Sequence, residues 1–494
     1  MVGRSLSLVL AALLGGCAAV GPDYHVPDAA VVKAAEARAA FVSGRTVATA
    51  EPLPDGWWRL YADPALDRLV AEALQANTDL RVAEANLERS LALLDAQGAS
   101  RELQGSLDAE TSYAQRSAEA ELQHVKPPTR QIYNAGIAVS YDLDLFGGLR
   151  RGIEAAGADA EAAVAARDLV RINVAAETAR AYADICNSGF QIDVLGRSIG
   201  LQDKGVHLAR ILADNGRAAP YEIDRRQAAL DTTRARLPRL SARQRNALFR
   251  LAALQGRTPR DADTALLACR HPLELPQRIP VGDGEALLRR RPDVRMAERR
   301  LAAATARIGV ATAELYPDIR IGAGVGSTGA AADFLSPLTN RFGLGPLIHW
   351  TLNRHAARAR IAAAEAQSRA ELAAFDGVVL KALREVEAAL DSYAAGLAQQ
   401  DELDRARDEA ASVASRLARL RRGGKIAELP ALEAERDLVA AEIAAAANRA
   451  VLNEDQITLF LALGGGWASE NRRLPASSVR QEPGFRASPA RADP

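Results

Sequence analysis

The chain of 494 residues is poor in side chains that bind metals or act as nucleophiles. It contains three cysteines, two methionines and six histidines. The histidines closest in sequence, His349 and His355, lack ligand spacing and are more simply read as solvated or lumen-facing side chains. The sequence also lacks a glycine-rich phosphate loop and a nucleophile elbow. We therefore expect no catalytic residue, no bound cofactor and no metal site.

Net charge and a long apolar segment at the N-terminus are missing as well. The 62 basic and 62 acidic residues balance, so the composition gives no reason to expect a nucleic-acid partner. An apolar run at residues 6–14 is too short to span a bilayer as a stable helix. Because Arg4 precedes this run and small residues follow it, the run is typical of an export signal.

The end of this signal resembles the lipobox of bacterial lipoproteins. It reads Leu-Gly-Gly-Cys, and in a lipobox the cysteine, here Cys17, becomes the lipidated first residue of the mature chain. Acyl chains would anchor the N-terminus, since each buried methylene contributes about 0.8 kcal/mol; an ordinary signal with a chance cysteine is the alternative. Ala18, in place of Asp, is compatible with sorting to the outer membrane. We predict a signal peptide at 1–16 and a lipid-anchored, extended segment at 17–62.

The two remaining cysteines would lie in an oxidising compartment. Cys186 falls within a helical pattern, and Cys269 lies 83 residues further on. Two cysteines are too few for a disulfide framework in a chain of this length. Whether a single bridge joins them is left open by the sequence.

The most informative positive feature is an internal duplication. Five residues match five others at a constant offset of 208 positions: Leu212, Gly216, Leu230, Leu251 and Gly256 match Leu420, Gly424, Leu438, Leu459 and Gly464. A second set, which includes Asp79 and Asp293, matches at an offset of 214. Because the two offsets differ by only six, the segments between the sets also correspond. We predict repeats at 63–260 and 286–467, a linker at 261–285 and a disordered tail at 468–494.

Long amphipathic helices dominate the predicted structure. The segments 153–212 and 356–429 contain no proline and carry apolar residues three and four positions apart. Sixty helical residues would extend about 90 Å, which exceeds the core of a compact domain. Alanine on the apolar stripes favours the close helix packing of coiled coils.

Four segments instead alternate apolar and polar residues, which predicts strands. They lie at 106–113, 133–145, 319–326 and 342–352. Each has about the length that crosses a membrane when tilted, and aromatic residues lie near their ends, as in an aromatic girdle. On the polar positions we expect residues that face a barrel lumen, namely Asp108, Glu110, Asp142, Arg320 and His349. Four strands cannot close a barrel and open edges are unfavourable in lipid, so we expect the chain to oligomerise.

At this point the sequence resembles the outer membrane efflux protein family, specifically its lipoprotein branch of TolC-like channels. The resemblance covers residues 1–467 and is carried by CAAVGPDY at 17–24, WW at 57–58, YDLDLFG at 141–147, LEAERDL at 432–438 and LALGGGW at 461–467. It implies a mainly α fold with a transmembrane β-barrel. In such a fold three protomers close one 12-stranded barrel and form a long α-helical periplasmic tunnel. It also implies an outer membrane location, a periplasmic adaptor and an inner-membrane RND-type pump as partners, and the export of drugs or other solutes.

The resemblance also gives the duplicated glycines a role. In this family they mark the periplasmic tips of two helical hairpins, here at Gly216 and Gly424. The family closes its tunnel with carboxylates nine, and sometimes six, residues after the second glycine. Here the ninth residue is Glu433 and the sixth is Pro430, which departs from the pattern. We expect Glu433, with Glu428, to form the gate; a solvated Glu433 without a gating role is the alternative.

Two further features depart from regular helices or from the family. Pro238 lies deep in a predicted helix and should kink it or mark its end. The second strand-to-helix exit reads TLNRH at 351–355, where the family usually has Pro-Leu-Phe and glycines, which puts the geometry of that turn in doubt.

Three classes of function remain open on the sequence. The first is a passive conduit without catalysis, gated at the helix tips. The second is a structural or adhesive trimer built on a coiled-coil stalk, which would have no use for alternating strands. An exported hydrolase is a distant third, because no Ser/His/Asp or Cys/His constellation can be assembled.

Overall fold

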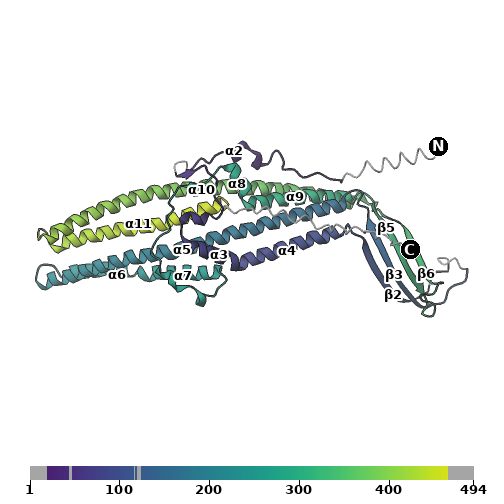
Figure 1. The fold of residues 1–494 in the computed structure, drawn as a ribbon, viewed down its shortest axis with the longest axis horizontal. Coiled ribbons are helices and arrows are strands. Elements are labelled where there is room, and N and C mark those ends of the chain that lie inside the picture. Colours follow the sequence, from purple (N-terminus) through teal and green to yellow (C-terminus); the bar gives the residue numbers. More distant parts are fainter. Residues whose placement is uncertain (1–18, 44–46, 116, 119–123, 466–494) are drawn as a thin grey trace, which may run out of the picture.

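A computed structural model describes residues 19–43, 47–115, 117–118 and 124–465. Within them, long helices run side by side and a sheet extends from one end of the helical bundle (Figure 1). Cys17, the predicted signal at 1–16 and the predicted tail at 468–494 lie outside the described residues. No helix in the described part of the chain is long and apolar enough to cross a membrane.

The element order confirms the duplication. The first repeat contains α3 (Pro64–Ala76), α4 (Thr78–Ala99), β2 (Gln104–Ala114), β3 (Arg130–Asp142), α5 (Gly148–Asp214), α6 (Tyr221–Arg234) and α7 (Leu237–Leu254). The second contains α8 (Gly284–Arg290), α9 (Pro292–Ala313), β5 (Asp318–Gly329), β6 (Asn340–His349), α10 (Arg354–Arg422) and α11 (Glu428–Ala462). In each repeat two helices precede a hairpin of strands, and a very long helix then returns along the molecule.

Shorter elements precede the first repeat and link it to the second. The N-terminal segment contains η1 (Val31–Lys33), α2 (Ala35–Arg38), β1 (Ala48–Thr49) and η2 (Trp57–Tyr61). The linker contains η4 (Pro259–Asp261), η5 (Thr264–Ala268) and β4 (Ile279–Pro280), and β4 pairs in parallel with β1. The N-terminal segment and the linker between the repeats therefore meet beside the bundle.

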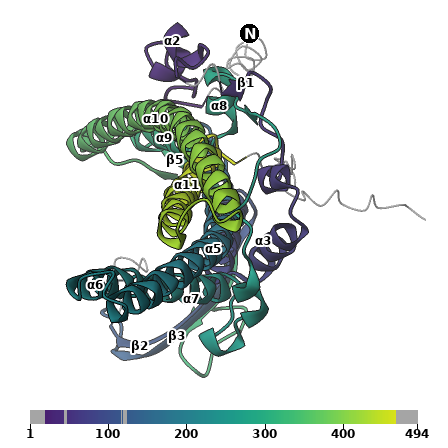
Figure 2. The same cartoon turned by 90° about the vertical axis from the view of Figure 1, so that its left-hand side faces the viewer.

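The long helices are explained by their sequences. α5 has 67 residues and α10 has 69, so each extends about 100 Å, as the proline-free segments predict. Seen along the bundle, α10, α11, α5 and the α6–α7 pair form a curved layer (Figure 2). Nearer the sheet, α9 packs between α5 and α10, and α4 packs on the other side of α5. The helices thus build one curved wall.

The two helical hairpins differ in their returning arm, which is broken into α6 and α7 in the first repeat. α6 ends at Arg234 and α7 begins at Leu237, so Pro238 is the second residue of a new helix. A proline in the first turn sacrifices no helical hydrogen bond, because the first amide groups of a helix have no partner in it. The prediction that Pro238 marks a break is confirmed, while the corresponding α11 is continuous over 35 residues.

The main core lies midway along the bundle and incorporates the N-terminal segment. Trp57 is fully buried and stacks on Phe460 of α11 at 4.5 Å, and Trp58, also buried, contacts the ring of Trp57 edge-on at 6.0 Å. In the same region Cys186 of α5 is bonded to Cys269 of the linker. The question that the sequence left open is settled in favour of one bridge.

Candidate functional site

The four long strands form one antiparallel sheet in the order β2-β3-β5-β6. The register places Leu107 opposite Ile137, Ile137 opposite Val325 and Val325 opposite Phe342. These four side chains therefore form one row across one face, and their exposed fractions are 74%, 56%, 60% and 90%. A contiguous exposed apolar surface of this kind marks contact with another apolar phase, so this face suits lipid.

The opposite face of the sheet carries the predicted lumen residues. Directly paired residues lie on the same face of a sheet, and the register pairs Asp142 with Arg320 and Asp318 with His349. Asp108 and Glu110 belong to the same face through their partners on β3. All five predicted residues therefore share one polar face, on which Ile132 and Leu347 are large apolar exceptions.

Ion pairs and hydrogen bonds order this polar face. Arg320 lies 2.7 Å from Asp318 and 3.5 Å from Asp142. Arg341 of β6, which the sequence analysis did not single out, donates to Thr328 on the adjacent β5 and to Asn134 on β3. The alternation of the sequence predicts the face of each residue, but these contacts depend on the strand register, which the sequence alone does not give.

Both edges of this sheet are open in the described residues. β2 and β6 each pair with one strand only, so the sheet is not closed within one chain. Unpaired backbone groups at an edge are costly in lipid. The sheet can become a membrane-spanning structure only when another chain covers its edges.

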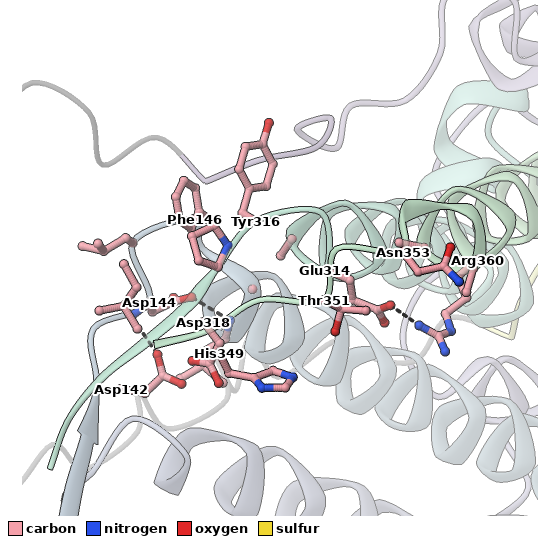
Figure 3. Close-up of a pocket in the computed structure, with 18 residues that line it drawn as sticks. Asp142, Asp144, Phe146, Glu314, Tyr316, Asp318, His349, Thr351, Asn353 and Arg360 are labelled. Carbon is pink, nitrogen blue, oxygen red and sulfur yellow. Dashed lines mark hydrogen bonds and ion pairs between the residues drawn. The ribbon is translucent and has the colours of Figure 1, made fainter. Parts of the chain in front are cut away.

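A cavity of about 460 Å³ lies where the sheet joins the helices (Figure 3). The rings of Phe146, in the turn from β3 to α5, and of Tyr316, in the turn from α9 to β5, stack at 4.5 Å beside it. Carboxylates around the cavity already have partners: Glu314 pairs with Arg360, and Asp144 accepts from the amides of Leu149 and Arg150. The described residues contain no group of three or more His, Cys, Asp or Glu side chains arranged to hold a metal ion.

The strand-to-helix turns differ from the sequence-based prediction in two details. The strand predicted at 133–145 ends at Asp142, because Asp144 adopts a positive φ and binds the first amides of α5. The strand predicted to 352 ends at His349. In the unusual exit at 351–355, Asn353 accepts from the His355 amide and so replaces glycine by an N-cap at the start of α10.

The hairpin tips lie at the end of the bundle opposite the sheet (Figure 1). Gly216 follows α5 and Gly424 follows α10, with φ of +69° and +65°. Around each glycine two backbone hydrogen bonds close the helix end in the same pattern: Arg217 to Leu212 and Gly216 to Ala213, and Lys425 to Leu420 and Gly424 to Arg421. These are Schellman ends, which need a left-handed residue and therefore favour glycine.

The predicted gate residues lie near the second tip and both have arginine partners. Glu428, the first residue of α11, lies 2.6 Å from Arg421 of α10. Glu433 lies 3.5 Å from Arg226 of α6, so this contact joins the second hairpin to the first. The sequence analysis missed Arg226, although a signal was present: Arg226 is ten residues after Gly216, while Glu433 is nine after Gly424.

A curved helical wall that carries a sheet with one apolar and one polar face defines a channel protein of the outer membrane type. The chain belongs to the family described as "Outer membrane efflux protein", whose model matches residues 69–257 and 284–465. It is thus an outer membrane efflux channel, and the two matched segments correspond to the two repeats of the fold.

Known proteins of this kind are similar to the chain over most of their length. The "Pyoverdine export outer membrane protein OpmQ" of Pseudomonas putida is 28% identical over 86% of this chain and 91% of its own length. The "Toluene efflux pump outer membrane protein TtgC" of Pseudomonas putida is 29% identical over 94% and 95%. The solved structure of the outer-membrane channel OprN superposes with a TM-score of 0.80 at 31% identity, over 91% of this chain and 99% of that chain.

Proposed function

We propose that the protein is the outer membrane conduit of a tripartite efflux system. In this proposal it acts as a passive homotrimer, receives solutes from an inner-membrane RND-type pump through a periplasmic adaptor, and releases them outside the cell. The observation that carries the proposal is the open sheet with an exposed apolar face. Three copies of a four-stranded sheet give twelve strands, enough for a barrel.

The polar face of the sheet would line the lumen of that barrel. Its charged residues, among them Asp108, Glu110, Asp142 and Arg320, would influence conductance, while solutes in a wide pore contact such side chains only in passing. The relatives are named for pyoverdine and for toluene. We propose drugs or other small solutes as the cargo, selected by the pump rather than by this chain.

We further propose that the helix tips gate the tunnel. A trimer would place three Glu433 carboxylates around one axis, where like charges repel each other and attract cations. The contact with Arg226 gives each carboxylate a competing partner within its own chain. At 3.5 Å, with the Glu433 side chain about half exposed, this ion pair is weak enough to exchange.

Lipidation completes the proposal. Acyl chains on Cys17 would hold the N-terminus in the outer membrane, and the helical bundle would extend into the periplasm from the sheet.

Drug accumulation in the native host tests the proposed function, because the host supplies the matching adaptor and pump. Deleting the gene should raise the cellular accumulation of some members of a panel of dyes and drugs, and a plasmid copy should reverse the effect. Unchanged accumulation across the panel, in a wild type that demonstrably contains the protein, would contradict the proposal.

A further inference from the structure

The first described residues of the chain lie in a fitted site at the junction between sheet and helices. This site, here called the N-terminal cradle, is formed by Gly147, Arg151, Glu298, Arg299 and Gly309 and holds residues 19–24. The amide of Val20 donates to the carbonyl of Phe146 at 3.0 Å. Four residues later, the Tyr24 hydroxyl donates to Glu298 at 3.1 Å, and the Arg299 guanidinium lies 5.6 Å from its ring centroid.

Arg151 is the centre of the cradle. It is a charged residue of α5 that is only 5% exposed. Its Nε donates to the Val20 carbonyl, and its Nη2 donates to the Gly21 carbonyl and to Asp23, the last at 2.6 Å. Its Nη1 donates to Glu154 on the same helix. Three of these four contacts are to the N-terminal segment, so its departure would remove most of the hydrogen bonds of this guanidinium.

Three glycines give the segment room to approach. A Cβ atom at Gly309 of α9 would lie 2.6 Å from Cγ of Arg151 and 2.9 Å from the Val20 carbonyl oxygen. A Cβ at Gly147 would lie 2.4 Å from the Cβ of Ala19. Gly21 itself has a φ of +88° and would collide with Gly309 if it carried a side chain. The segment and its site are therefore complementary in shape as well as in charge.

The cradle takes residues from both repeats. Gly147 is the N-cap of α5 and Arg151 lies in its first turn, whereas Glu298, Arg299 and Gly309 belong to α9. Beyond the cradle the same segment continues along the second repeat, where Asp376 accepts from the Val31 amide and Glu387 accepts from the amides of Val42 and Ser43. Burial and then the nearby Glu298 raise the pKa of Tyr24 above its usual value, so the protonated, donating form of this hydroxyl is favoured.

We propose that the N-terminal cradle is a peptide-binding site for the start of the mature chain. By binding residues 19–24 it fastens the two repeats together at the sheet end and sets where the chain leaves the body toward Cys17. Cys17 lies two positions before Ala19, a reach of at most about 7 Å. This last consequence rests on the proposed lipidation of Cys17, whose acyl chains would begin within that reach of the cradle. The contacts that carry this inference do not depend on conduction or on the identity of the cargo.

Amide hydrogen exchange of the purified full-length oligomer tests the cradle. In Arg151→Leu, peptides that cover residues 19–26 should exchange roughly tenfold faster or more, because hydrogen bonds to a charged group are lost. Arg151→Lys should restore only part of the protection, since an ammonium group cannot donate in the fork that a guanidinium provides. The matched control is Arg197→Leu on the same helix, whose side chain is 51% exposed and pairs with Glu442; exchange at 19–26 should not change.

A second variant decides the case if Arg151→Leu fails to assemble. The Asp23 side chain is 93% exposed, so Asp23→Ala removes its bond to Arg151 without opening a void. It should accelerate exchange at 19–26 and leave peptides at the helix tips unchanged. Wild-type protection of 19–26 in a folded Arg151→Leu protein, or in Asp23→Ala when the first variant does not assemble, would overturn the proposal.

Discussion

Arginine partners decide what the acidic residues of this chain can do. Glu433 was selected from sequence by its distance from Gly424, yet in the structure it contacts Arg226 across the two hairpins. A free ring of carboxylates and a ring already neutralised by arginine would have different affinities for cations. The balance between these two arrangements should therefore be visible in the response of the channel to divalent ions.

Single-channel recordings of two tip variants distinguish these arrangements. Glu433→Ala should raise conductance and weaken block by divalent cations, because it removes charge and bulk from the periplasmic mouth. Arg226→Ala should strengthen block, because it frees Glu433 to bind cations. Glu409→Ala, an exposed carboxylate on α10 away from the tips, is the control. Equal conductance and block in all four proteins would remove Glu433 from the gate.

The residues that sequence reasoning missed are those whose role depends on distant contacts. Arg151 is one of 62 basic residues, and nothing local distinguishes it. Its importance appears only when the fold brings Arg151 of α5 against Gly21, 130 residues earlier in the sequence, and against α9. Glu433 was accessible to sequence because its position follows a duplicated turn, whereas Arg226 required comparing the two turns with each other.

At the level of elements, periodicity predicted most of the fold. The long helices α5 and α10 and the four strands occur where the apolar spacing places them. The ends of elements were less predictable, because side chains that accept from the first helical amides decide them. Asp144 accepts from the Leu149 amide at the start of α5, and Asn353 accepts from the His355 amide at the start of α10, where glycine was expected. A bridge between Cys186 and Cys269 could not be read from spacing, since proximity of α5 to the linker is a tertiary property.

The two faces of the sheet can be tested at adjacent residues of one strand. Leu107→Lys places a charge on the apolar face and should impair membrane assembly, at a cost of about 2–4 kcal/mol near the middle of the bilayer. Asp108→Lys makes the same addition on the polar face and should leave assembly intact while it shifts ion selectivity toward anions. Outer membrane fractions and heat-modifiability on gels report assembly. Equal assembly of the two variants would refute the assignment of the faces.

The disulfide makes a separate prediction about the linker. The bridge joins Cys186 to Cys269 across a sequence separation of 83 residues. A disulfide of this kind typically stabilises the folded state by about 2–4 kcal/mol. Replacing both cysteines by serine should lower the thermal midpoint of the oligomer and speed proteolysis at residues 259–283, while single-channel conductance stays near wild type. Unchanged stability and proteolysis would show that the linker is held by packing alone.

The whole molecule unites two different environments in one chain. The sheet has one exposed apolar face and two open edges. The helices form a curved layer whose exposed side chains are mostly polar. Neither part is complete alone, because the edges of the sheet need other strands and the curved wall needs other walls. The stalk that the sequence left open as an alternative would have no use for such a sheet. The family to which the chain belongs supports the conduit.

The central claim is that three copies of this chain form one conducting pore. The most direct measurement is planar-bilayer conductance of the detergent-purified oligomer, with its mass determined on the same sample. Our account predicts a mass of three chains and discrete, long-lived conductance steps, which become larger in Glu433→Ala. A trimer that never conducts, even with Glu433 replaced, would contradict the account.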